Sequence, residues 1–153
     1  MANSYTQLYV QIIFAVKGRE NLIAERYRDE LEKYICGIIS KGKSKALAIY
    51  CNPDHVHILI GLNPMLSVSD LVRDIKSNSS KFINKKGWFA GEFSWQEGYG
   101  AFTHSKSQLD VVYKYILGQA EHHKRRSFKE EYLGLLQKWE VEYNEMYLFE
   151  WDN

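Results

Sequence analysis

Two apolar patterns alternate along the chain: dense runs of aliphatic and aromatic residues, and stretches in which apolar residues recur every three or four positions. Dense runs are typical of buried strands, and the three- and four-residue spacing is typical of amphipathic helices. The dense runs predict strands over 5–16, 46–51, 55–60 and 93–104, the last one bulged at its glycines. The spaced stretches predict helices over 24–41, from Ser67 toward Gly87, from 108 to about 124, and from 128 to about 139.

The order of these elements, β-α-β-β-α-β followed by two helices, predicts an α+β fold of the ferredoxin-like class. Its antiparallel sheet would carry helices on one face, and the C-terminal helices would be added to this core. The sequence contains no internal repeat, low-complexity segment or linker. We therefore expect a single domain over 1–153, with a core of about 5–125 and a helical, acidic extension of about 126–153.

Serine residues precede three of the predicted helices, at Ser67, Ser107 and Ser127. A serine hydroxyl in this position can accept a hydrogen bond from a free N–H group of the first helical turn. The three serines therefore predict where these helices begin.

Length and composition are those of an ordinary globular domain, with 153 residues, 45% apolar residues and 25% charged residues. Cys36 and Cys51 lie inside predicted elements without a metal-binding spacing, so we expect buried free thiols in a reducing compartment. The N-terminus lacks the basic and apolar regions of a signal peptide, and no apolar run reaches membrane-spanning length. We therefore expect a cytoplasmic protein with no membrane partner.

The net charge of +1 conceals an asymmetry along the chain. Residues 127–153 hold two basic and seven acidic side chains, which leaves a charge of +6 on residues 1–126. A basic body suits a polyanionic ligand such as a nucleic acid, although a solvated lysine-rich surface has the same composition. The aromatic content of 14% supplies rings that either stack on bases or fill the core.

Two histidines, His55 and His57, follow an Asn-Pro-Asp turn at 52–54 and open a predicted strand. Successive strand residues point to opposite faces, so the two imidazoles share one face and lie about 7 Å apart along the strand. Two imidazoles at a fixed separation can chelate one metal ion. The structural alternative is a pair of half-buried histidines that hydrogen-bond to their neighbours, and the motif alone leaves both interpretations open.

Polar side chains recur at four-residue spacing in the predicted helix that begins at residue 108. Tyr115, Gln119 and His123 would therefore lie on one helical face. Gly118 is unfavourable in a helix interior and could permit a bend. Polar helix faces are common without any function, so this face gains its meaning only together with the histidine pair.

The strand with the histidine pair and the helix with the polar face together indicate metal-assisted chemistry on a phosphodiester. His55, His57 and the amide oxygen of Gln119 would give a metal three protein ligands, a mixed set that suits Mg²⁺ or Mn²⁺ better than a closed zinc site. The metal would act as a Lewis acid, and Tyr115, one turn from Gln119, could attack phosphorus and hold the DNA covalently. His123 could assist the metal, contact a phosphate or cap the end of the helix.

Basic side chains near these elements are candidates for contacts with the DNA backbone, although they would equally form a solvated face. The candidates are Lys76, Lys81, Lys85 and Lys86 on the second predicted helix, and Lys124, Arg125 and Arg126 after the third.

Four motifs in order carry a resemblance to a known family: the Asn-Pro-Asp-His-Val-His stretch at 52–57, the segment 67–81, the Gly-Tyr-Gly-Ala-Phe strand within 95–102, and the Tyr-Ile-x-x-Gln motif at 115–119. From about residue 5 to 125 the chain resembles the IS200/IS605-like single-tyrosine (Y1) transposases of the HUH superfamily of single-strand DNA nucleases. That group includes REP-associated tyrosine transposases. The resemblance implies that His55, His57 and Gln119 are metal ligands and that Tyr115 is the nucleophile.

The resemblance further implies a 5′-phosphotyrosine intermediate with a free 3′-OH, formed on single-stranded DNA near imperfect hairpins at the element ends. It also implies a homodimer in which the tyrosine helix of one subunit can complete the metal site of the other. Tyr113 is the rival nucleophile, but it is six residues from Gln119 and therefore lies on another helical face.

Four other functions are alternatives. Another HUH nuclease, such as a Rep- or relaxase-like nickase, would share the histidine pair. A histidine-triad hydrolase would need a third histidine where Leu59 stands, and a zinc hydrolase would need a further ligand, a role that His123 could fill. A non-catalytic ferredoxin-like module would stack single-stranded nucleic acid on its sheet, but RNP-type aromatic motifs are missing from the sequence.

Overall fold

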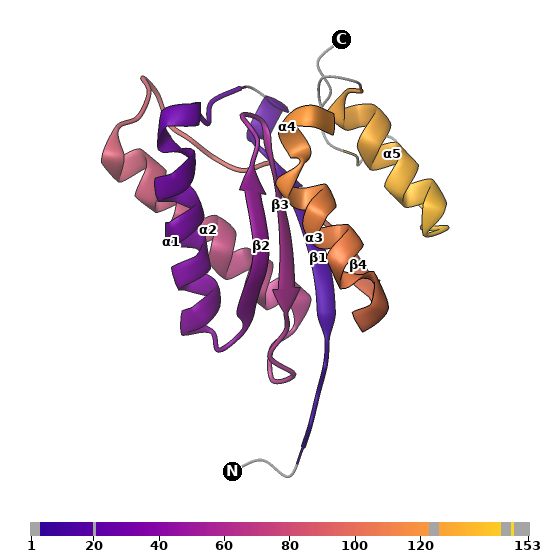
Figure 1. The fold of residues 1–153 in the computed structure, drawn as a ribbon. Helices are drawn as coiled ribbons and strands as arrows, with labels where there is room; N and C mark the ends of the chain where they lie inside the picture. Colours follow the sequence, from indigo (N-terminus) through magenta and orange to yellow (C-terminus); the bar gives the residue numbers. More distant parts are fainter. Residues whose placement is uncertain (1–3, 20, 123–125, 145–147, 149–153) are drawn as a thin grey trace.

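Residues 4–19, 21–122, 126–144 and 148 are described by the computed structural model (Figure 1). Their strands form one antiparallel sheet in the order β2-β3-β1-β4. The strands are β1 (Tyr9–Ala15), β2 (Lys45–Cys51), β3 (His55–Gly61) and β4 (Gly100–His104). The first strand lies between the third and the fourth, and a helix occupies each long connection. This is the ferredoxin-like arrangement, which confirms the predicted fold class.

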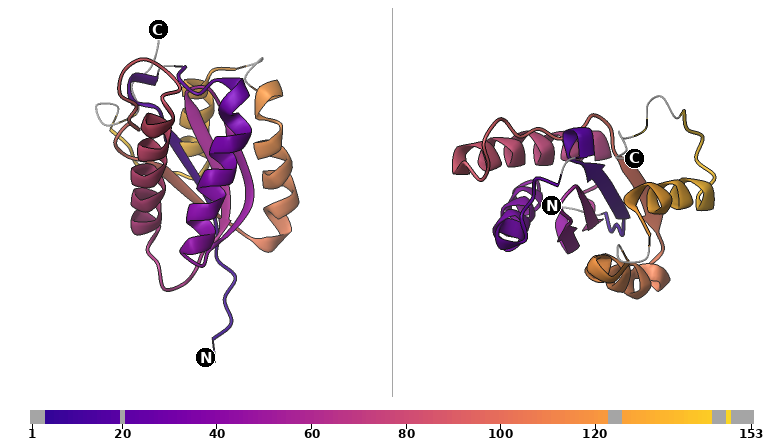
Figure 2. Two further views of the ribbon diagram at one scale, coloured as in Figure 1. Left: turned by 90° about the vertical axis from the view of Figure 1, so that its left-hand side faces the viewer. Right: turned by 90° about the horizontal axis from the view of Figure 1, so that it is seen from above.

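Helices lie on both faces of the sheet, as the view from above in Figure 2 shows. α1 (Arg28–Lys41) and α2 (Val68–Lys86) pack on one face and enclose the larger core. α3 (Leu109–Leu117) and α5 (Phe128–Lys138) pack on the opposite face, and the short α4 (Gln119–His122) follows α3. Three 3-10 turns complete the elements: η1 (Lys17–Arg19), η2 (Glu25–Tyr27) and η3 (Lys106–Gln108).

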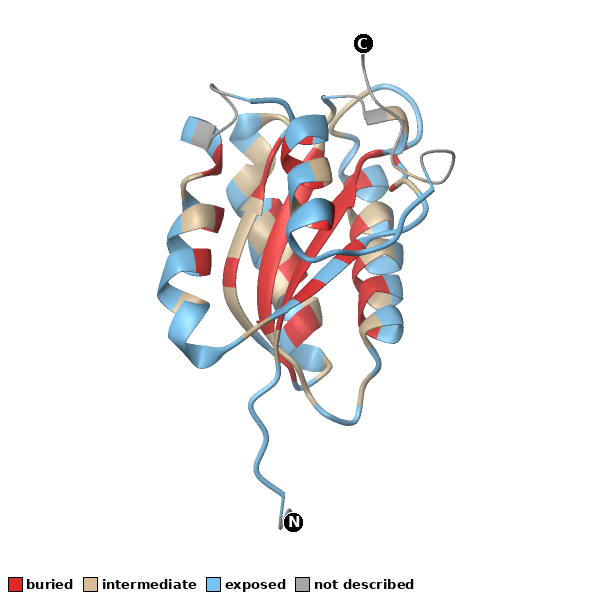
Figure 3. Cartoon of the chain, turned by 90° about the vertical axis from the view of Figure 1, so that its right-hand side faces the viewer, coloured by how far each residue is buried: buried red, intermediate tan, exposed pale blue. Residues whose placement is uncertain are grey.

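Strand β3 is buried on both of its faces, which Figure 3 shows as a continuous red strand. Val56, Ile58 and Ile60 belong to the core under α1 and α2. Leu59 belongs to the cluster under α3, on the same face as the two histidines. Because both faces are covered, the apolar residues form a dense run and not a strict alternation.

The C-terminal residues that the sequence predicts as an extension pack directly on the sheet. Phe128, Tyr132 and Leu136 of α5 are buried in one cluster with Ile13 and Phe102 of strands β1 and β4. These apolar side chains of α5 recur at three- and four-residue spacing, so the helix presents one apolar face to the strands. Helix α5 therefore covers the end of the sheet that carries the histidine pair.

The fourth strand is shorter than the predicted 93–104, because only Gly100–His104 pair with β1. Trp95 makes an isolated bridge with Val16 and donates its indole N–H to the Ser79 hydroxyl, 2.9 Å away. Between Trp95 and the start of β4, Gly98 has a φ angle of +88°, a backbone conformation that glycine adopts without strain. The glycine-rich stretch is therefore a turn that precedes the strand, not a bulge within it.

The predicted third helix is divided at Gly118, where α3 ends before α4 begins. Ser67 and Ser127 are confirmed as N-caps, because their hydroxyls accept hydrogen bonds from the N–H groups of Asp70 and Glu130. The prediction for Ser107 is wrong: this residue lies inside η3, and α3 begins after that turn without a side-chain cap.

Both cysteines are free thiols, as predicted; Cys51 is buried and Cys36 is half-buried. Within the described part of the chain, each helix is too short or too polar to cross a lipid bilayer.

Candidate active site

The site is built on β3, where the strand leaves the turn at 52–54. His55 and His57 are 1% and 0% exposed, and their ring centroids are 5.2 Å apart. Their backbone is fixed on both sides, since β3 pairs with β1 and β2 along this stretch. The two imidazoles therefore have a rigid separation, as the sequence predicts.

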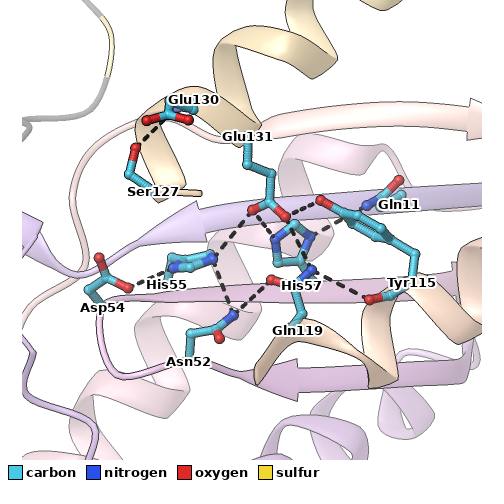
Figure 4. A network of polar contacts seen from close by, with 10 residues as sticks. All are labelled: Gln11, Asn52, Asp54, His55, His57, Tyr115, Gln119, Ser127, Glu130 and Glu131. Carbon is cyan, nitrogen blue, oxygen red and sulfur yellow. Dashed lines mark hydrogen bonds and ion pairs between the residues drawn. The ribbon is translucent and has the colours of Figure 1, made fainter. Parts of the chain in front are cut away.

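A third potential ligand comes from α5. The Oε1 atom of Glu131 lies 3.0 Å from Nε2 of His57 and 3.6 Å from Nε2 of His55 (Figure 4). Glu131 is 1% exposed, so its carboxylate is desolvated and depends on these partners. The potential ligand atoms of the three residues lie within 4.8 Å of one another.

The orientation of His55 is set by its neighbours. The Asp54 carboxylate accepts the hydrogen bond of Nδ1, 2.7 Å away, which leaves Nε2 facing Glu131. The ring also stacks on Phe128 of α5, with the centroids 3.8 Å apart. Burial lowers the pKa of His55, but the hydrogen bonds and charges of Asp54 and Glu131 outweigh burial and raise the pKa above its ordinary value.

Tyr115 of α3 meets this group within the same chain. Its hydroxyl donates a hydrogen bond to the Oε2 atom of Glu131, and its ring centroid lies 5.8 Å from that of His57. Burial raises the pKa of Tyr115 above its ordinary value, and the charge of Glu131 raises it further. The phenol therefore keeps its proton while it faces the carboxylate.

Gln119 lies at the start of α4 and is fully buried. Its Oε1 atom accepts a hydrogen bond of 3.1 Å from Asn52, and its Nε2 atom donates to Glu131 at 3.2 Å. Although the helix is divided at Gly118, Tyr115 and Gln119 both contact Glu131. The same amide group of Asn52 also lies 3.1 Å from Nε2 of His55, so the turn, the strand and α4 share one polar network.

The donor set fits a divalent cation. Ligand atoms around one such ion lie about 3 Å apart, given metal–oxygen distances near 2.1 Å. The separations of 3.0 and 3.6 Å between Glu131 and the two histidines are close to this value. Two imidazole nitrogens and a carboxylate oxygen, with the Gln119 amide beside them, form a mixed N/O set, which open catalytic sites commonly use.

Sequence reasoning missed Glu131, although the sequence contains a signal for it. Phe128, Tyr132 and Leu135 follow the three- and four-residue spacing of an amphipathic helix, and Glu131 lies on that same stripe. An acidic residue on an apolar stripe needs a partner when the helix packs. The sequence predicts Asn52 only as part of a turn, whereas its amide group contacts both His55 and Gln119.

The remaining predicted residues lie elsewhere. Lys76, Lys81, Lys85 and Lys86 are on α2, across the sheet from the histidine pair. Lys76 donates to the carbonyl oxygens of Gln96 and Gly98, at 2.8 and 2.6 Å, and burial lowers its pKa to about 8. Lys86 is 3.5 Å from the carboxylate of Glu30 on α1.

Three predicted residues, His123, Lys124 and Arg125, lie outside the described residues. Arg126 is described and exposed, and it lines a cavity together with Tyr115. Tyr113, the rival nucleophile, is 45% exposed.

Comparison with known proteins gives one family. Residues 4–119 match the family model described as "Transposase IS200 like", which spans more than half of the chain. The ISDra2 transposase TnpA of Deinococcus radiodurans is 26% identical over 120 residues, which cover 74% of this chain and 84% of that transposase.

Two solved structures share the fold. A candidate transposase from Deinococcus radiodurans R1 superposes with a TM-score of 0.61 at 23% identity, covering 78% of this chain and 95% of that chain. A REP-associated tyrosine transposase bound to a REP hairpin superposes with a TM-score of 0.58 at 17% identity, covering 80% of this chain and 73% of that chain.

Proposed function

Because this chain belongs to the IS200-like transposase family, we propose that it cleaves and rejoins single-stranded DNA through a 5′-phosphotyrosine intermediate on Tyr115. The single observation that carries the proposal is the position of the Tyr115 hydroxyl. It reaches Glu131, whose other carboxylate oxygen faces the histidine pair. A phenol at the edge of a three-residue cation site has the arrangement that covalent phosphodiester cleavage needs.

In the cleavage step the Tyr115 oxygen forms a bond to phosphorus, and the bond from phosphorus to the 3′ oxygen breaks. The phenol proton passes to Glu131, which already accepts its hydrogen bond, and the leaving 3′ oxygen takes up a proton from water. The products are a 5′-phosphotyrosine and a free 3′-OH. Attack by a 3′-OH on the phosphotyrosine reverses the step and joins the strands.

His55, His57 and Glu131 would hold a divalent metal, Mg²⁺ or Mn²⁺. Gln119, the third ligand that the sequence predicts, presents its amide nitrogen to Glu131 and its oxygen to Asn52, so its amide group would have to turn to offer the oxygen to the metal. When bound, such an ion supplies Lewis-acid polarisation of the scissile phosphate. The protein orients His55 through Asp54 and keeps water away by packing Phe128 on the imidazole. Both contacts support a preorganised ligand set.

Hairpin-flanked single strands are the proposed substrate. The structural neighbour that is bound to a REP hairpin supports this class of DNA. A homodimer is part of the same proposal, and the contact of Tyr115 with Glu131 and His57 of its own chain supports a site that is completed within each subunit.

The test is covalent capture. The protein is incubated with a 5′- or 3′-labelled single strand that carries a hairpin from the DNA flanking the gene, with Mg²⁺ or Mn²⁺, and then separated under denaturing conditions. We expect a protein–DNA adduct that retains only the 3′ part of the strand and disappears with EDTA. Peptide mapping should find the phosphodiester on Tyr115. An adduct on another residue would reject this nucleophile.

A further inference from the structure

A groove extends from the candidate active site between α3 and α5 to the end of β4. It consists of an inner cavity of about 260 Å³ and an outer cavity of about 450 Å³, which share several lining residues. The shared lining residues are His104, Val111, Val112, Lys138 and Trp139. The inner cavity is also lined by Tyr115 and Glu131, and the outer one reaches Ser105 and Gln108. This α3–α5 groove therefore begins at the candidate nucleophile.

The charged groups of the groove favour an anion. Arg126 and Lys138 line it, and Glu131 is the sole acidic side chain among the described lining residues. Glu131 lies at the inner end, where His57 and Tyr115 contact it. Arg126 lines the inner cavity with Glu131, whereas Lys138 lines both cavities, and no carboxylate is among the described residues that line the outer one, which suits a phosphate there.

An aromatic ring forms part of the wall. Trp139 is 38% exposed, yet its ring is held by Phe102, at a centroid distance of 6.3 Å, and by the edge of His104 at 5.4 Å. The Nζ atom of Lys138 lies 6.0 Å from the centroid of the same ring. An exposed indole with a cation beside it is a stacking platform for a base that is followed by a phosphate.

These features favour a single strand over a duplex. Bases in a duplex are stacked inside it and cannot lie on an indole, whereas unpaired bases can. The outer cavity, of about 450 Å³, lies in the size range of small-ligand pockets and can hold a group such as one nucleotide.

We propose that the α3–α5 groove binds the single-stranded DNA next to the phosphate that Tyr115 attacks, with a base on Trp139 and phosphates at Lys138 and Arg126. The inference rests on the proposed function and adds a substrate-binding role for the C-terminal end of α5. Trp139 and Lys138 are positioning residues in this scheme, since they contact the strand and not the reacting phosphate.

The experiment measures the dissociation constant of the full chain for a short fluorescent oligothymidylate, in EDTA, over a series of salt concentrations. Trp139→Ala should weaken binding about 5- to 100-fold, and Trp139→Phe should restore most of it, because stacking on an aromatic ring is lost and then recovered. Lys138→Gln should lower the slope of log Kd against log salt by about 0.7, because one phosphate contact is lost. Lys129→Gln is the matched control, since Lys129 is an exposed cation of the same helix.

A 5-iodouracil strand provides a second readout that does not depend on affinity, because we expect it to crosslink to Trp139. If the wild type forms no phosphotyrosine adduct but this crosslink appears, the groove assignment stands and the proposed function fails. If the adduct forms while folded Trp139→Ala and Lys138→Gln bind DNA like the wild type, the groove assignment is overturned and the function stands. A wild type that binds no single-stranded DNA overturns both.

Discussion

The Tyr115 hydroxyl donates its hydrogen bond to Glu131, a carboxylate from a helix that begins thirteen residues later in the chain. The other oxygen of this carboxylate lies 3.0 Å from Nε2 of His57. One acidic side chain therefore links the candidate nucleophile to the candidate metal ligands. This link gives Glu131 two roles to test, as a proton acceptor and as a ligand.

Replacing Tyr115 by phenylalanine should abolish the covalent adduct and leave binding of single-stranded DNA within about twofold of the wild type. The substitution removes only the hydroxyl, and stacking and phosphate contacts carry most of the affinity for a single strand. Denaturing gels measure the adduct, and fluorescence anisotropy measures binding.

Tyr113→Phe is the matched control, because Tyr113 lies two residues away on α3 and is 45% exposed. It should form the adduct at the wild-type rate. A persistent adduct in Tyr115→Phe, combined with its loss in Tyr113→Phe, would reverse the assignment.

Replacing Glu131 by glutamine should weaken binding of Mn²⁺ by about tenfold or more and slow adduct formation in parallel. The amide keeps the size of the side chain but removes the negative charge that a divalent ion requires. Calorimetric titration of the EDTA-treated protein with Mn²⁺ measures the affinity.

Glu130→Gln provides the control, since Glu130 is the exposed neighbour on the same helix turn. The affinity of Gln119→Leu for Mn²⁺, measured in the same way, tests the third ligand that the sequence predicts against Glu131, the ligand that the structure adds. An affinity that falls for Gln119→Leu but stays unchanged for Glu131→Gln would leave the amide as the third ligand and limit Glu131 to accepting the proton.

The fold was largely predictable because burial on both faces leaves dense apolar runs, and the capping serines at Ser67 and Ser127 mark helix starts. The boundaries of the fourth strand were not predictable. Trp95 is as apolar as a strand residue, but the turn at Gly98 separates it from the hydrogen-bonded part of β4. Local pattern cannot distinguish these two cases.

The site was predictable where its geometry is local. His55 and His57 are two residues apart on a strand, and Tyr115 and Gln119 are four apart along a helical stretch, so periodicity alone groups each pair. The helical spacing places Glu131 on the buried stripe of α5, but the residues that it meets are decided by how α5 packs on the sheet, which the spacing does not encode. Residues 127–153 contain seven acidic side chains, and the sequence alone does not distinguish the buried Glu131 from the others.

Mixing Tyr115→Phe with His57→Ala should recover no adduct formation, although each variant lacks a different part of the site. In the structure the ring of Tyr115 lies 5.8 Å from that of His57 in its own chain, so each chain assembles a complete site. Denaturing gels on an equimolar mixture measure recovery, and mixtures of each variant with wild-type protein serve as controls. Clear recovery in the double mixture would establish that tyrosine helices are exchanged between subunits.

Replacing Gly100 by alanine should destabilise the protein by about 1–3 kcal/mol and weaken Mn²⁺ binding, because it displaces α5. An added Cβ would lie 2.7 Å from the hydroxyl oxygen of Tyr132 and 3.2 Å from the ring of Phe102, in a buried cluster. Thermal unfolding should show a Tm lower by about 2–4 °C per kcal/mol. Gly37→Ala, at an exposed position of α1 where a Cβ meets nothing within 4 Å, should instead raise stability by about 1 kcal/mol. A Gly100→Ala protein with unchanged Tm would contradict the packing of α5 that brings Glu131 to the site.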